Sequence, residues 1–259
     1  MVEMRPFELI EPRSLQEAIA ALRDEGARPM SGGTALMLMM KAGVLRPTRL
    51  VSLRRLGLEG IQANGSLRVG AMTTLRALEK SEAVRKGWPA ITKTLRTLSN
   101  VRVRNVATVG GALAHGDPHM DLPPLLAALG ARVTIAGPKA ERTLPVEEIY
   151  AGYLETNLKS GELITRVDIP SLGKKRAAYL KCTTRSADDW PAVGVAVVLG
   201  EEDRIFVSAA TDRPTRLASV NEVDKLNIEG DLHGSAAYKK QLLKVYLKRA
   251  MDEARNAGH

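Results

Sequence analysis

Apolar and polar positions along the chain follow two periods, and together they predict a mixture of short strands and helices. Strands are expected at 7–10, 28–30, 50–53, 132–136, 163–169, 177–183, 192–199 and 205–210. Asn64-Gly65 separates two further apolar runs and predicts a β-hairpin there. Because hairpins are mixed with helices, the pattern favours an α+β fold over a doubly wound parallel sheet.

Helices are expected where apolar residues recur every three to four positions, at 14–23, 35–41, 74–81, 89–98, 121–130 and 235–255. Ser14 and Glu17 form a capping box at the start of the first helix. The last helix carries an apolar stripe, with its lysines, Lys239 among them, expected on the opposite, solvated face. The stretch 105–112 is expected to be a strand followed by a tight turn. A boundary near 170–175 predicts two domains, 1–172 and 173–259.

The 259 residues carry 38 Lys and Arg against 29 Asp and Glu, a net charge of +9. A nucleic-acid binder is one interpretation, but aromatic residues are few and no nucleic-acid motif is present. Between Ala83 and Gly116 there are six basic residues and no acidic one. This segment leads into a glycine turn, so it suits a compact anionic ligand; a solvated basic face is the alternative.

Cysteine and histidine usage restricts the chemistry further. The single cysteine, Cys182, excludes an internal disulfide and a cysteine-built metal or iron–sulfur site, and we expect an inert, half-buried thiol. His115 and His119 have the spacing of a metal pair, but Gly116 and Pro118 break the helix that such a pair needs. No long apolar run or signal-peptide core is visible, which predicts a soluble cytoplasmic protein without a membrane span.

Two glycine turns are the candidate binding elements. Ser31-Gly32-Gly33-Thr34 precedes a helix, and its successive N–H groups could form a nest for a phosphate; a plain tight turn is the alternative. Thr108-Val-Gly-Gly-Ala112 adds a hydroxyl and two more glycines. Asp121, which follows it, could accept from a hydroxyl of a ligand or cap a helix. Neither turn matches a dinucleotide fingerprint or a phosphate loop.

These motifs resemble the FAD-binding medium subunits of the molybdenum hydroxylases, such as carbon monoxide, xanthine and archaeal aldehyde dehydrogenases. The resemblance rests on Ser31–Leu36, on Val103–Ala112 (VRNVATVGGA) and on Ala114–Pro123 (AHGDPHMDLP). Gly161–Pro170 and the terminal helix add to it, and the likeness spans nearly the whole chain. Ala112 stands where the family usually has Asn or Asp, and 211–234 is shorter and less similar.

The resemblance implies a vanillyl-alcohol-oxidase-type FAD-binding domain of two α+β subdomains, with a small α+β C-terminal domain covering the flavin. It also implies a set of cofactor-binding residues: Arg28, Pro29, Met30, Ser31, Gly32, Gly33, Thr34, Ala35, Leu36, Leu98, Ser99, Thr108, Val109, Gly110, Gly111, Ala112, Asp121, Ile164, Lys181 and Trp190. Lys181 would lie near the flavin ring and Trp190 would cover it. An exposed strand lysine and a core tryptophan are the alternatives.

The resemblance further implies a function in electron transfer, with no catalytic acid, base or nucleophile on this chain. Electrons would pass from iron–sulfur clusters of a small subunit through FAD to an external acceptor, after substrate oxidation at a molybdenum cofactor in a large subunit. A dimer of heterotrimers is the implied assembly. The alternative is a stand-alone flavin oxidoreductase of the same fold.

Overall fold

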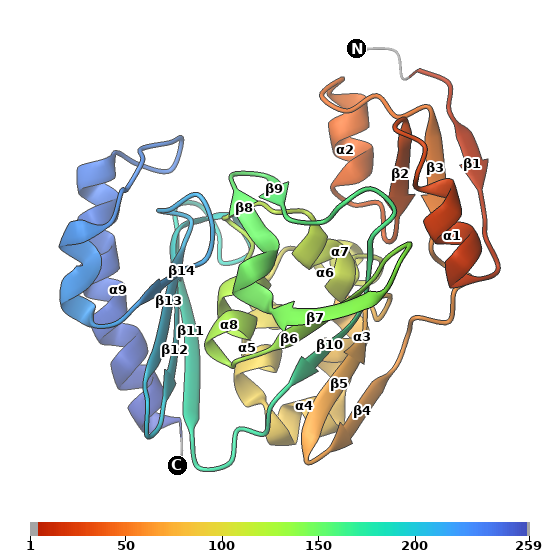
Figure 1. Ribbon diagram of the computed structural model, residues 1–259. Helices are drawn as coiled ribbons and strands as arrows, with labels where there is room; N and C mark the ends of the chain where they lie inside the picture. Colours follow the sequence, from red (N-terminus) through yellow and green to blue (C-terminus); the bar gives the residue numbers. More distant parts are fainter. Residues whose placement is uncertain (1–4, 258–259) are drawn as a thin grey trace.

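The computed structural model describes residues 5–257, and its described strands form three larger sheets and one short hairpin (Figure 1). The first sheet contains β1 (Glu8–Ile10), β3 (Arg49–Ser52) and β2 (Ala27–Met30), in that spatial order and all parallel. Helix α1 (Leu15–Ala21) joins β1 to β2, and α2 (Leu36–Lys41) follows β2. Thus β2 leads directly through the first glycine turn into α2.

The capping box of α1 is present in a slightly different form from the prediction. Ser14 Oγ accepts from the N–H of Glu17 at 3.2 Å, as expected for an N-cap. The Glu17 carboxylate accepts from the N–H of Arg13, one residue earlier than in the usual reciprocal box. The helix therefore starts as predicted, but it ends at Ala21 rather than near Arg23.

The second sheet is antiparallel and has the spatial order β4-β5-β10-β6-β7. Its strands are β4 (Ile61–Asn64), β5 (Ser66–Gly70), β6 (Arg132–Ala136), β7 (Glu141–Pro145) and β10 (Leu163–Ile169). Gly65, with φ of 73°, makes the predicted hairpin turn between β4 and β5. The 3-10 helix η1 (Val146–Ile149) and the pair β8 (Tyr150–Gly152) and β9 (Glu155–Thr156) lie between β7 and β10.

Six helices connect β5 to β6: α3 (Leu75–Lys80), α4 (Glu82–Gly87), α5 (Pro89–Thr97), α6 (Val101–Arg104), α7 (Val109–Ala114) and α8 (Leu122–Ala128). Neither α4 nor α6 was predicted. The prediction of a strand within 105–112 is wrong, because Thr108 caps α7 and its side chain accepts from the N–H of Gly111. The β-branched residues before Thr108 suggested a strand, but a capped helix forms instead.

The third sheet is antiparallel, in the order β11-β12-β13-β14, and α9 packs against β11 and β12 (Figure 1). Its elements are β11 (Arg176–Thr183), β12 (Pro191–Leu199), β13 (Arg204–Ser208), β14 (Thr215–Leu217), the 3-10 helix η2 (Val220–Lys225) and α9 (Ala236–Asn256). The fourth strand, β14, was not predicted. The predicted domain boundary falls in the link between β10 and β11 and stays a prediction.

Helices α5, α7 and α8 lie between the two antiparallel sheets, and one core joins all three layers. This core contains Leu67 from β5, Val167 from β10, Leu125 from α8 and Phe206 from β13, all almost completely buried. Burying large apolar side chains of this kind stabilises a fold by about 1.5–3 kcal/mol each. The continuous core positions α7 and α8 between the two sheets.

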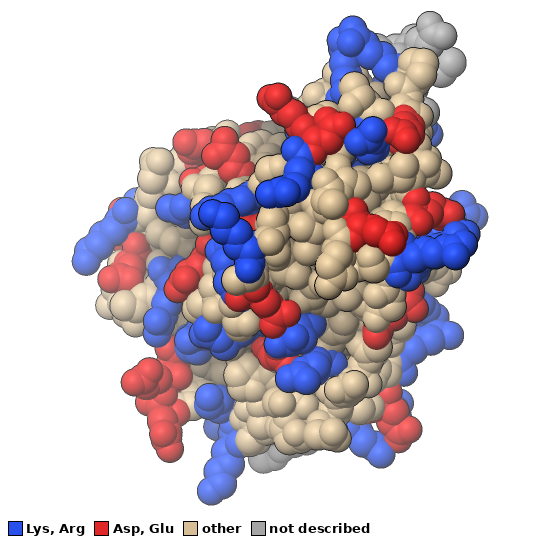
Figure 2. Space-filling model, turned by 45° about the vertical axis from the view of Figure 1, so that its right-hand side comes forward, with Lys and Arg blue, Asp and Glu red and all other residues tan. Residues whose placement is uncertain are grey.

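The last helix differs from the sequence prediction at one lysine. Lys239 is predicted on the solvated face of α9, but only 1% of it is exposed, and its ammonium group is paired. Acidic and basic side chains are intermingled over the face of the molecule in Figure 2. Among residues 5–257, no helix has the length and apolar character needed to span a membrane.

Candidate functional site

A cavity of about 610 Å³ opens between the β2–α2 turn, the start of α7 and the strand β11. This volume lies within the range of about 300–1,000 Å³ that is typical of small-molecule and cofactor sites. All predicted site residues except Met30 and Val109 line it. Val109 instead faces the core with 1% exposure, and Met30 ends strand β2. The structure therefore brings both glycine turns and the distant Ile164, Lys181 and Trp190 to one place.

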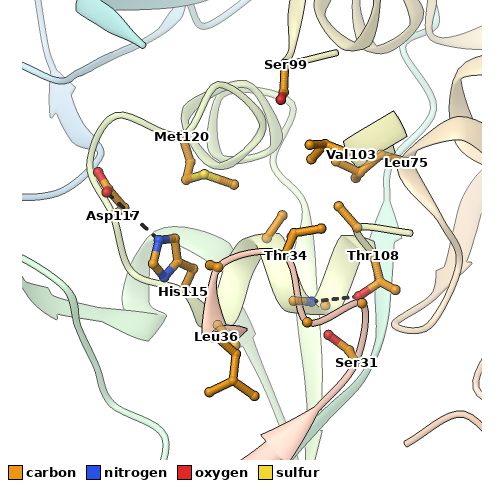
Figure 3. Close-up of a pocket in the computed structure, with 18 of the residues that line it drawn as sticks. Ser31, Thr34, Leu36, Leu75, Ser99, Val103, Thr108, His115, Asp117 and Met120 are labelled. Carbon is orange, nitrogen blue, oxygen red and sulfur yellow. Dashed lines mark hydrogen bonds and ion pairs between the residues drawn. The ribbon is translucent and has the colours of Figure 1, made fainter. Parts of the chain in front are cut away.

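The first glycine turn offers unpaired main-chain donors. A Cβ on Gly32 would lie 2.0 Å from the carbonyl oxygen of Val106, so the turn and the segment before α7 touch backbone to backbone. Gly33 has φ of 71°, a left-handed conformation that favours glycine. Within residues 5–257, no hydrogen bond engages the N–H groups of Gly32, Gly33 or Thr34. Ser31 and Thr34 lie at the cavity in Figure 3.

The second glycine turn is built differently. The N–H of Gly110 donates to Ala71 O at 2.8 Å, and the N–H of Gly111 donates to Thr108 Oγ1 at 3.1 Å (Figure 3). A Cβ on Gly110 would lie 2.7 Å from the Cβ of Ala71. These glycines are thus needed for close packing, and their N–H groups are already used within the protein. Among these glycines, the N–H groups without a hydrogen-bond partner in residues 5–257 are therefore those of the first turn.

The Leu98–Ser99 bend at the cavity is held by a buried arginine. Ser99 has φ of 52°, which is unusual for a residue with a side chain. Arg104 donates to the carbonyl oxygens of Leu98, at 3.0 Å, and of Ser99. Its Nε also pairs with Glu79 at 3.0 Å, with both side chains 9% exposed. Burial would raise the pKa of Glu79, but Arg76 and Arg104 outweigh it and lower this pKa.

The basic segment 83–116 lines the cavity through residues such as Leu98, Ser99 and Thr108, and its suitability for an anionic ligand stays a prediction. None of its six lysines and arginines is among the described residues that line the cavity. Lys86 pairs with Glu82 and Lys93 with Glu253 on the surface, and Arg104 is structural. Charge clustering in sequence thus did not identify the side chains that line the cavity.

A buried ion pair closes one wall of the cavity. Lys181 Nζ contacts Asp121 Oδ2 and Thr97 O at 2.9 Å each, and Asp189 O at 3.1 Å. These contacts use all three donors of the ammonium group. Lys181 thus joins β11 to three other segments and is not an exposed strand lysine. Asp121 makes no capping bond to α8, which rules out the helix-cap alternative.

The carboxylate of Asp121 has a second partner in Tyr179. The Tyr179 hydroxyl donates to Asp121 Oδ1 at 2.7 Å. Burial raises the pKa of Asp121, and the neighbouring Lys181 opposes this shift. Burial and the adjacent carboxylate together raise the pKa of Tyr179 well above its usual value, so this hydroxyl stays a donor.

Sequence reasoning missed the acidic and histidine residues of the α7–α8 loop as part of the cavity wall. His115, Asp117 and His119 all line it, and Figure 3 shows His115 directed at Asp117. Burial lowers the pKa of His115. No group of three or more His, Cys, Asp or Glu side chains in residues 5–257 is arranged to hold a metal ion. Their membership in the AHGDPHMDLP motif was the available signal.

The remaining wall is mainly apolar. It includes Leu36, Leu75, Val103, Met120 and Ile164, of which several are labelled in Figure 3. Trp190 lies at the rim with 44% exposure, so it is not the core tryptophan of the alternative interpretation. Apolar walls next to a nest of free N–H groups suit a ligand with flat rings and a phosphate group, and FAD has both. The residues present therefore fit that cofactor.

Comparison with known proteins supports this fit. Residues 5–172 match the family described as "FAD binding domain in molybdopterin dehydrogenase". The carbon monoxide dehydrogenase medium chain of Afipia carboxidovorans is 30% identical, with 96% of each chain covered. The glyceraldehyde dehydrogenase medium chain of Sulfolobus acidocaldarius is 27% identical, covering 95% of this chain and 98% of its own.

Solved structures agree over the full length. The carbon monoxide dehydrogenase of Hydrogenophaga pseudoflava has a chain with a TM-score of 0.93 and 28% identity, covering 99% of both chains. Quinoline 2-oxidoreductase of Pseudomonas putida 86 has one with a TM-score of 0.89 and 28% identity, covering 100% of both. These matches confirm the predicted fold class. The chain therefore belongs to the family of FAD-binding medium subunits of molybdenum hydroxylases, and it is an oxidoreductase subunit with FAD as its cofactor.

Proposed function

We propose that this chain holds FAD in the cavity described above and relays electrons within a molybdenum hydroxylase complex. Electrons would come from iron–sulfur clusters of a small partner subunit and leave to an external acceptor, while a large subunit with the molybdenum cofactor oxidises the substrate. The names of the relatives, which are medium chains of dehydrogenases, support this role. A dimer of heterotrimers in the cytoplasm is the assembly and location that we propose.

The observation that carries the proposal is the set of three unpaired N–H groups at Gly32, Gly33 and Thr34 beside the cavity. We assign them to the pyrophosphate of FAD, because hydrogen bonds to a charged group contribute about 1.5–3 kcal/mol each. Bound FAD would supply reversible one- and two-electron chemistry, which none of the side chains offers.

The other residues that line the cavity have supporting roles in this proposal. The apolar side chains from α2, α3 and α6 exclude water from the rings. Thr108 fixes the start of α7 behind the turn, and the Asp121–Lys181 pair keeps β11 against the cavity. Trp190, from the loop before β12, covers the open side. Met30 and Val109 do not line the cavity, so the proposal gives them no contact with FAD.

A charge substitution at Thr34 tests the assignment. Thr34→Glu places a carboxylate at the nest and is expected to weaken FAD binding at least tenfold through repulsion of the phosphates. Thr34→Gln has the same size without the charge and is the control, with an expected change below threefold. Flavin fluorescence titration of the purified chain measures both. Equal affinities for the two variants would contradict the pyrophosphate assignment.

Co-purification tests the assembly. Affinity isolation from the native source should recover two further subunits, one with molybdenum and one with iron and acid-labile sulfide, together with flavin. Recovery of the chain alone with FAD, active on a substrate of its own, would instead favour a stand-alone flavin oxidoreductase.

A further inference from the structure

The imidazole of His119 links the α7–α8 loop at the cavity to the C-terminal part of the chain. His119 Nδ1 lies 2.9 Å from Asp117 Oδ1, and His119 Nε2 lies 3.0 Å from Asp231 Oδ2. Asp117 belongs to the same loop, whereas Asp231 lies between η2 and α9. His119 and Asp117 line the cavity, and the ring of His119 meets Trp190 edge-on with centroids 6.1 Å apart.

The buried Lys239 binds the same carboxylate of Asp231 that His119 contacts. Lys239 Nζ lies 2.5 Å from Asp231 Oδ2 and donates to Ala209 O at 2.8 Å. Ala209 has φ of 64°, and its N–H donates to Pro118 O at 3.0 Å. The α7–α8 loop, the end of β13 and the start of α9 thus meet through a closed set of hydrogen bonds, with His119 at the edge facing the cavity.

The geometry defines the state of the imidazole. Each ring nitrogen faces a carboxylate oxygen, and an ionised carboxylate only accepts hydrogen bonds. A neutral imidazole has one donor and one acceptor, so it satisfies one carboxylate and repels the other. Only the protonated ring donates to both.

We propose that protonated His119 is a positioning residue that latches the Asp231 loop and α9 to the wall of the FAD cavity, so that cofactor retention depends on its protonation. This inference rests on the proposed FAD site. Loss of the proton turns one of the two contacts into a repulsive pair of acceptors. The contact between Asp117, His119 and Asp231 then opens, and the wall that supports Trp190 loosens.

The groups around the latch favour the proton. Asp117 and Asp231 face the ring, and Asp189 lies beside Trp190. His115, His233 and Tyr153 are the other titratable groups nearby, and Lys239 is the one cation among the described groups that contacts Asp231 besides His119. Burial alone would lower the pKa of His119, but the bonds to both carboxylates outweigh it and raise this pKa above 6.5. The latch is therefore complete below about pH 6.5 and is lost as pH rises through the raised value.

Cofactor affinity as a function of pH tests the latch without any turnover. Wild-type chain is titrated with FAD at pH 6.0 and pH 8.5, and we expect about tenfold weaker binding at the higher pH, within the usual range of coupling between sites. His119→Gln keeps hydrogen-bonding groups but cannot be charged, so its affinity should be nearly the same at both values. His233→Gln removes the neighbouring imidazole and is the matched control that should behave like the wild type.

The proton itself provides a second readout. Coupling is reciprocal, so a tenfold effect on FAD binding requires the NMR-measured pKa of His119 to rise by about one unit when FAD binds. Equal pH dependence in wild type and His119→Gln, or the same His119 pKa with and without FAD, would overturn the latch. Absence of FAD binding at both pH values would instead refute the proposed function, and the latch with it.

Discussion

Ser31 and Gly111 lie so close that a Cβ on Gly111 would be 2.5 Å from the Oγ of Ser31. The two residues are far apart in sequence, and each belongs to one of the glycine turns. The absence of a side chain on Gly111 therefore leaves room for the Ser31 hydroxyl where the two turns meet. Thr108 Oγ1, at 3.0 Å from the same point, closes the remaining space.

Gly111→Ala tests this contact. Crowding in a packed site costs about 1–3 kcal/mol, partly offset by about 1 kcal/mol from the better helix propensity of alanine, so a net loss of about 1 kcal/mol is expected. Adding Ser31→Ala removes the nearest atom and should recover most of this loss in urea unfolding. Gly110→Ala is the control, because it meets Ala71, including its backbone, and Ser31→Ala should not rescue it. Full additivity of Gly111→Ala and Ser31→Ala would show that the two turns do not touch.

The buried pair Asp121–Lys181 should be strongly coupled. Lys181→Met leaves Asp121 ionised among apolar neighbours or forces it to take up a proton, and we expect a loss of about 3–5 kcal/mol. The double variant Asp121→Leu/Lys181→Met removes both charges and should lose less than Lys181→Met alone. Thermal and urea unfolding of the wild type, Lys181→Met, Asp121→Leu and the double variant gives the coupling energy. A value near zero would contradict a stabilising interaction between Asp121 and Lys181.

Arg104 should be irreplaceable even by lysine. Lys keeps the charge opposite Glu79 but lacks the planar fork that reaches two carbonyl groups at the Leu98–Ser99 bend. We expect Arg104→Lys to lower the free energy of unfolding by about 1–3 kcal/mol. Arg102→Lys, on the exposed side of the same short helix, is the control and should change stability by less than 0.5 kcal/mol. Equal stabilities of the two variants would remove the role given to Arg104.

The carboxylate of Asp231 should make the free energy of unfolding decrease at low pH. Burial would raise its pKa, but the bonds to Lys239, His119 and the His233 N–H outweigh it and lower this pKa to about 2. Its contribution is therefore complete above pH 4 and is lost as pH falls towards 2. Because Asp231 is partly exposed, screening limits this contribution to about 1 kcal/mol. Unfolding free energies between pH 5 and pH 2.5 should fall more steeply for the wild type than for Asp231→Asn.

Local signals predicted much of the fold from sequence. Ser14 with Glu17 located the start of α1, Asn64-Gly65 located the hairpin, and β10 was placed at its observed bounds. Alternation and capping depend on neighbouring residues, so they are visible in the chain itself. The short helices α4 and α6 were not predicted, because a helix of one or two turns carries too few apolar positions to show a period.

What sequence could not give was the partner of each polar residue. Lys239 sits at a polar position of α9, yet its ammonium is satisfied by Asp231 and Ala209 from separate segments. Likewise the sequence predicts that the glycines of the second turn bind a ligand, while the N–H groups of Gly110 and Gly111 donate to Ala71 and Thr108. Such pairings depend on which segments the topology brings together. The family resemblance brought residues from distant segments into one predicted site, and most of them line the same cavity.

The strand order of the central sheet has a consequence for how the protein is made. β10 lies between β5 and β6, pairing Val167 with Val69 on one side and with Val133 on the other. The β4–β5 pair and the β6–β7 pair therefore share no hydrogen bonds with each other. Both pair with β10, which is the last of the five strands to be synthesised. Because Ile164 of β10 also lines the cavity, a nascent chain shorter than about 170 residues has no finished pocket to offer a flavin. In the proposed site, cofactor loading would accordingly follow synthesis of this strand.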